Sequence, residues 1–81
     1  MSAPDDAERA ILDLLAARGA DKTICPSEAA RALARVPDQW RSEMERVHKA
    51  VDALNAAGEI QLSWKGVELD QRRGAYRIAR R

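Results

Sequence analysis

The spacing of apolar residues predicts a first helix near the start of the chain. Its apolar stripe consists of Ile11, Leu14 and Leu15. Asp5 stands before this stripe as an N-cap, and Glu8 three residues later can complete a capping box. Gly19 is the expected C-terminal stop. The pattern therefore predicts a helix from residue 5 or 6 to about residue 18.

Two further helices are predicted on either side of a proline. The second begins at Pro26, where the missing N–H of proline costs nothing, and it runs to about Ala34. Pro37 breaks the pattern, and Asp38 is expected to cap the third helix, which covers about residues 39–57. Its apolar residues, spaced by four and three, are Trp40, Met44, Val47, Val51 and Leu54. A break of three or four residues between two helices is typical of a helix-turn-helix.

The remaining segments have the alternation of short strands. Residues 23–25 form a β-prone triplet, and residues 59–64 alternate between apolar and polar side chains. Gly66 offers a turn or a bulge, and residues 67–69 can extend the hairpin. Residues 70–74 form a polar loop, and residues 75–78 are expected to form the return strand. We therefore predict an α+β, mainly helical fold of the winged helix-turn-helix type, a single domain over residues 1–81. Its helix-turn-helix covers about residues 26–57, and its antiparallel hairpin, the wing, covers about residues 59–79.

Charge changes this picture only mildly. The chain has 81 residues and a net charge of +1, so it has no bulk attraction to nucleic acid. The first 40 residues hold seven acids and five bases, whereas the remainder hold six acids and nine bases. The last ten residues contain Arg72, Arg73, Arg77, Arg80 and Arg81 and no acid. This asymmetry points weakly toward a polyanionic partner.

Several classes of function receive no support. Cys25 is the single cysteine, so no disulfide within the chain and no cysteine-based zinc site is expected. The acidic start does not have the pattern of a signal peptide, and no apolar run reaches the length of a membrane span. A cytoplasmic protein without a cofactor is therefore expected. The four glycines form no phosphate loop, and no arrangement of serine, histidine and acid residues suggests an enzyme.

A set of short motifs resembles one known family. They are residues 24–28, 30–31 and 40–41, then Met44, Val47, Gly58, Ile60, residues 65–66, Asp70, Gly74 and residues 76–78. In order and spacing they are similar to domain of unknown function 3253, a small bacterial family of winged-helix domains. Trp64 and Ala75 depart from the pattern, because a small or amide side chain and a proline are usual there. The resemblance implies the fold and no activity.

The third helix supplies candidate contacts for DNA. Its predicted solvent face includes Gln39, Arg41, Ser42, Arg46 and Lys49. In a recognition helix such a face enters the major groove, where arginine can pair with guanine and glutamine with adenine. The carboxylates of Glu43, Glu45 and Asp52 oppose this interpretation, and the alternative is a solvated face of mixed charge.

The wing and tail supply candidate phosphate contacts. They are Lys65, Arg72, Arg73 and Arg77, with Arg80 and Arg81 at the end of the chain. Six such contacts would give a log–log salt slope near about −5. The alternative is a tail that merely improves solubility, and the sequence pI of 7.9 is lower than that of most DNA-binding domains.

Four other residues have either a packing role or a functional one. His48 has no companion ligands for a metal and is expected on the helix surface, and Cys25 is expected to be a small buried residue. Trp40 is expected in the core, whereas Trp64 can close the core, stack on a base or contact a partner. The rival hypothesis to DNA binding is therefore a protein-interaction module, because winged helices serve both purposes.

Overall fold

The computed structural model describes residues 5–19 and 21–81 of the chain. The start of the acidic N-terminus and Ala20 of the expected loop lie outside these residues. The elements are α1 (Asp6–Arg18), β1 (Thr23–Ile24), α2 (Pro26–Leu33), the 3-10 helix η1 (Pro37–Glu43), α3 (Met44–Ala56), β2 (Ile60–Trp64), β3 (Val67–Leu69) and β4 (Arg77–Arg80). The prediction of an α+β, mainly helical fold is confirmed.

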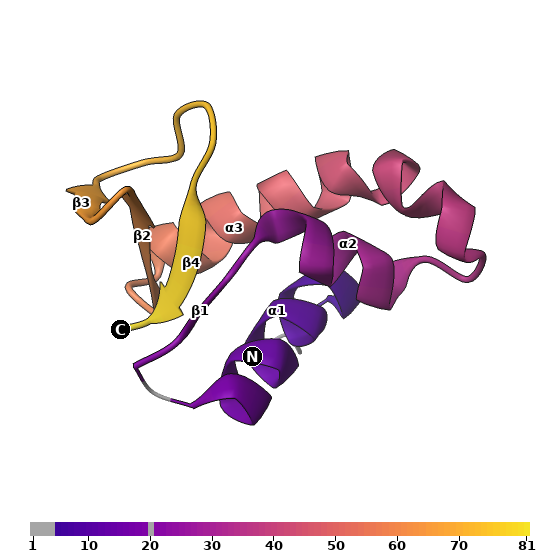
Figure 1. Ribbon diagram of the computed structural model, residues 1–81, viewed down its shortest axis with the longest axis horizontal. Helices are drawn as coiled ribbons and strands as arrows, with labels where there is room; N and C mark the ends of the chain where they lie inside the picture. Colours follow the sequence, from indigo (N-terminus) through magenta and orange to yellow (C-terminus); the bar gives the residue numbers. More distant parts are fainter. Residues whose placement is uncertain (1–4, 20) are drawn as a thin grey trace.

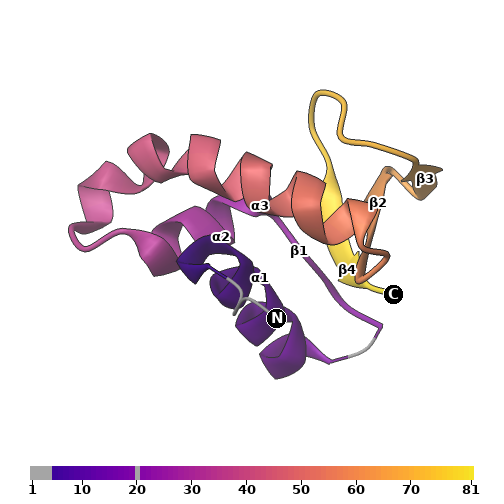
Figure 2. The ribbon, with the colours of Figure 1, turned by 180° about the vertical axis from the view of Figure 1, so that it is seen from behind.

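The three α-helices pack against one another, and the sheet lies at one end of α3 (Figures 1 and 2). The four strands are antiparallel in the order β1-β4-β2-β3, so β4 has a neighbour on each side. Ile78 of β4 is opposite Ile24 on one side and Leu62 on the other. The loop between β3 and β4 projects beyond the sheet in both views.

Local hydrogen bonds explain where the first two helices begin. The Glu8 N–H donates to Asp5 Oδ1 at 2.8 Å, and the Asp5 N–H donates to Glu8 Oε2 at 3.3 Å. The predicted capping box is thus present. At α2, the Glu28 carboxylate accepts the Cys25 N–H at 2.7 Å, one residue before Pro26. Both helices therefore satisfy exposed donors with their own acidic side chains.

The third helix differs from the prediction in its first turns. Residues Pro37–Glu43 form a 3-10 helix, with Val36 rather than Asp38 at the N-cap. The Gln39 N–H donates to the Val36 carbonyl at 2.9 Å, a three-residue bond that tightens this segment. The tighter winding rotates the helix face, so Trp40 and Met44 are half-buried at the edge of the core rather than within it.

The core is almost wholly aliphatic. Its buried residues are Ala7, Ile11, Leu15, Ile24, Ala29, Ala30, Val47, Ala50, Val51, Leu54, Ile60, Leu62, Tyr76 and Ile78. The alternation predicted for β2 is confirmed at Ile60 and Leu62, but Trp64 on the same face remains 41% exposed. Trp64 is therefore a surface residue at the end of its strand.

The hairpin turn and the return strand also refine the prediction. Lys65 and Gly66 connect the paired residues Trp64 and Val67, and both have positive φ, as a type I′ turn requires. The return strand is Arg77–Arg80 rather than residues 75–78. It is shifted toward the C-terminus because β1 and β2 both provide partners as far as residues 79 and 80.

We predict that Ile78→Val lowers the free energy of unfolding by about 1 kcal/mol, because it removes one buried methylene where two strand pairs meet. Val67→Ala is the matched control in the same sheet, since Val67 is 64% exposed. Urea denaturation followed by circular dichroism measures both. An equal loss in the two variants would contradict the central position of Ile78.

Candidate nucleic-acid interface

The candidate residues of the third helix are all on the surface. Gln39, Arg41 and Ser42 lie in η1, whereas Arg46 and Lys49 lie in α3, and all five are exposed. The Ser42 hydroxyl donates to the Gln39 carbonyl at 2.7 Å. Arg46 is paired with Glu43 at 3.0 Å, so its charge is partly neutralised. Gln39, Arg41 and Lys49 are the members of this group most open to a ligand.

An arginine that the sequence analysis missed joins this group. The guanidinium carbons of Arg31 in α2 and Arg41 in η1 each lie 4.6 Å from the centroid of the Trp40 ring. Within residues 5–19 and 21–81, no carboxylate forms an ion pair with either arginine. Two positive charges therefore share one indole beside the turn between α2 and η1. No spacing rule connects positions 31 and 41, so packing alone reveals this cluster.

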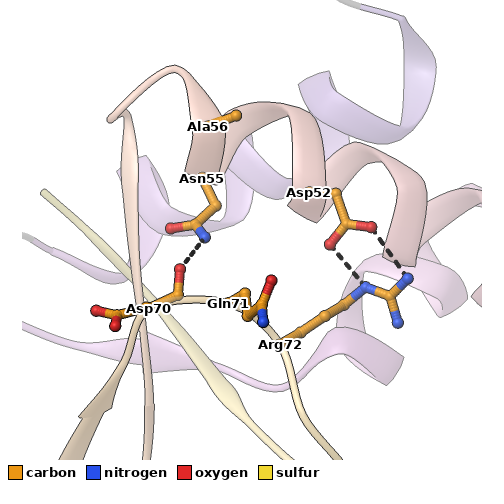
Figure 3. A pocket seen from close by; sticks show the side chains of 6 residues that line it. All are labelled: Asp52, Asn55, Ala56, Asp70, Gln71 and Arg72. Carbon is orange, nitrogen blue, oxygen red and sulfur yellow. Dashed lines mark hydrogen bonds and ion pairs between the residues drawn. The ribbon is translucent and has the colours of Figure 1, made fainter.

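Arg72 connects the loop between β3 and β4 to α3. Its Nε and Nη2 donate to the two carboxylate oxygens of Asp52 at 2.7 and 3.0 Å (Figure 3). The side-chain amide of Asn55 donates to the Asp70 carbonyl at 2.8 Å in the same hollow. A bidentate pair uses the guanidinium face that would otherwise receive a phosphate. Arg72 is therefore engaged within the domain, although both it and its neighbour Arg73 are exposed.

Arg77 also makes internal contacts. Its Nε donates to the Thr23 hydroxyl at 3.0 Å, and its Nη2 donates to the Thr23 carbonyl at 3.3 Å. Arg18 donates to the same carbonyl at 3.2 Å. Half-buried Arg77 thus connects β4 to β1, a structural role that the charge count could not distinguish from phosphate binding. Lys65 is exposed at the hairpin turn, with its Nζ 5.9 Å from the Trp64 ring centroid.

The N-terminus of α2 already holds a negative charge. Burial raises the pKa of Glu28, but hydrogen bonds from Arg18 and from the Cys25 N–H outweigh this effect and leave the pKa lowered. The ionised carboxylate satisfies the donor at this helix end. The Glu28 carboxylate therefore occupies the position that an external phosphate would need.

His48 is not the surface residue that its place on the helix suggested. His48 is half-buried, and its Nδ1 lies 2.6 Å from the Tyr76 hydroxyl. Tyr76 as a residue is 4% exposed. Burial and the positive charge of Arg72 lower the pKa of His48, so its neutral form is favoured. Burial also raises the pKa of Tyr76, which keeps its hydroxyl protonated. The pair connects α3 to the segment before β4.

Within the described residues, no cluster of three or more histidine, cysteine, aspartate or glutamate side chains could hold a metal ion. None of the helices there is long and apolar enough to cross a membrane.

The family model described as "Protein of unknown function (DUF3253)" matches residues 4–81. The chain belongs to the DUF3253 family. A search of curated proteins finds no match. This DUF3253 domain thus has the family membership that its sequence motifs suggested.

We predict that the free energy of unfolding of this DUF3253 domain falls as the pH is lowered through about 6.5. The pKa of His48 is lower in the folded protein than in the unfolded chain. As the pH falls, the unfolded chain therefore binds this proton before the folded protein does, and proton binding favours the unfolded state. Urea denaturation between about pH 7.5 and 5.5 measures this effect. His48→Gln, which keeps a polar group beside Tyr76, is expected to flatten the profile, and an unchanged slope in that variant would contradict the assignment.

Proposed function

We propose that this protein is a winged helix-turn-helix DNA-binding domain, a transcriptional regulator located in the cytoplasm. In this proposal α2, η1 and α3 form the helix-turn-helix, and the strands with their connecting loops form the wing. Gln39 and Ser42 face the major groove. The cations contact phosphates, and they are Arg31, Arg41, Lys49, Lys65 and Arg73. The proposal involves no catalysis and no cofactor.

The observation that carries the proposal is the cluster of Arg31 and Arg41 on the Trp40 ring. Both guanidinium groups lie over one indole and neither has a carboxylate partner in the described chain, so their charges are available to phosphate groups. The cluster joins α2 to η1, and in a helix-turn-helix the first of the two helices crosses the DNA backbone. Planar guanidinium groups also suit phosphate geometry.

The internal contacts narrow the set of candidate residues. Arg72 and Arg77 are held by Asp52 and Thr23, so we assign them to the support of the hairpin rather than to DNA. Arg46 remains a candidate only if its pair with Glu43 opens. The proposed interface therefore has five cations, which are Arg31, Arg41, Lys49, Lys65 and Arg73.

A specific observation supports a second candidate function, protein interaction without nucleic acid. Trp64 and Val67 are paired across the hairpin and are 41% and 64% exposed. Exposed apolar side chains side by side favour a protein surface more than a phosphate backbone. This alternative assigns the hairpin, rather than η1, to the partner.

We expect the purified domain to bind a labelled random-sequence DNA duplex at low salt, measured by fluorescence anisotropy. With five phosphate contacts the affinity should fall with a log–log salt slope of about −4.5. The double variant Arg31→Ala with Arg41→Ala should weaken binding and reduce the steepness of this slope by about 1.8, because it removes two contacts.

Arg9→Ala provides the control for charge, since it removes an exposed cation from α1 without touching the Trp40 cluster. Its effect on the slope is expected to be small. Absence of binding at low salt, or equal losses per charge removed in the control and the double variant, would rule out the proposed interface and favour a protein partner.

A further inference from the structure

A groove separates the third helix from the hairpin and the start of α2. One wall is formed by Trp40, Met44 and His48, which recur every four residues along η1 and α3. The other sides come from Trp64, residues 74–77 and residues 25–27. Its volume of about 520 Å³ is within the range typical of small-molecule sites, roughly 300–1,000 Å³.

The lining has an apolar body and a few polar groups. Both tryptophans of the chain, Met44 and Pro26 provide flat or polarisable apolar surface. Polar atoms come from the Cys25 thiol and the Ser27 hydroxyl, which lie 3.0 Å apart, and from the hydrogen-bonded His48 and Tyr76. This composition is typical of a site that holds a planar ring and orients one polar substituent.

The charged residue of the groove lining is positive, and two further cations lie beside its tryptophans. Arg77 is part of the lining, Lys65 lies over the Trp64 ring, and Arg41 lies over the Trp40 ring. Among the described residues, the lining includes no carboxylate. Glu28 of α2 and Asp52 of α3, two acids on the surrounding elements, are paired with Arg18 and Arg72. The groove therefore complements an anion.

We propose that this groove binds a small planar aromatic carboxylate. The aromatic ring packs against the two indoles and the Met44 thioether, and the carboxylate meets the cationic rim. The groove lies between η1–α3 and the hairpin, the two elements that the proposed function assigns to DNA. A carboxylate bound in the groove would therefore alter the affinity for DNA. That effect rests on the proposed function, whereas the binding of the carboxylate does not.

The two tryptophans permit a direct test without DNA. Sodium benzoate is titrated into the ¹⁵N-labelled full chain, and the two indole N–H resonances are followed by NMR. Because both indoles line the groove, we expect both signals to shift and saturate together, with a Kd of about 1 mM or tighter. Benzamide, which is planar but neutral, and cyclohexanecarboxylate, which is anionic but not planar, should each bind at least about tenfold more weakly.

Matched variants locate the site on the hairpin. Trp64→Ala is expected to weaken benzoate binding by at least about tenfold, as reported by the remaining Trp40 signal. Its partially exposed position leaves the core intact. Val67→Ala changes the adjacent exposed residue, which does not line the groove, and should bind benzoate as the original chain does.

Each contrary outcome overturns the proposal. Shifts that do not saturate, equal binding of benzamide, or unchanged binding by Trp64→Ala would each exclude a built aromatic-anion site. If the indole resonances shift with a short single-stranded oligonucleotide but not with benzoate, the groove is a nucleic-acid stacking surface and not an aromatic-anion site. Because no duplex is present, failure of this titration is distinct from failure of the DNA-binding experiment.

Discussion

β4 pairs with both β1 and β2, and this double pairing holds the sheet to the helices. β1 lies between the first two helices and β2 follows the third, so one strand near the end of the chain fixes both parts of the helical layer. Ile78 sits at the crossing of these pairs, opposite Ile24 and Leu62, and all three are fully buried. In a domain this small the buried area is limited, so this aliphatic contact across three strands is a large share of the core.

The positive charges of the domain divide into two groups with different physical roles. Arg72 forms hydrogen bonds that hold the loop between β3 and β4 to α3. Arg77 forms hydrogen bonds that hold β4 to β1. Arg31 and Arg41 instead stack on Trp40 at the surface. A guanidinium group suits either role, because its planar array of donors matches a carboxylate, a carbonyl or a phosphate equally well. Two of the arginines near the C-terminus, Arg72 and Arg77, thus have partners within the domain.

The aromatic residues also divide into two groups, one in the core and one at the surface. Tyr76 is the one aromatic residue in the described core, and its hydroxyl is satisfied by His48. Trp40 and Trp64 lie at the groove, where their rings are partly exposed beside cations. Alanine and aliphatic residues make up most of the interior, and Trp40 packs against its edge. Large apolar rings left at the surface beside positive charge are typical of a place where a ligand or partner is held.

The positions of α1 and α2, the capping box at Asp5, the turn near Gly66 and the α+β class follow from the sequence, because they depend on interactions between residues a few positions apart. Packing of the elements determines which side chains meet over long separations. Arg72 reaches Asp52 across 20 positions, His48 reaches Tyr76 across 28 and Arg77 reaches Thr23 across 54. Periodicity places a side chain on a face of its own element, but the partner opposite that face is set by the packing of elements against one another. For this reason the candidate cations could be counted from the sequence, whereas their availability to a ligand could not.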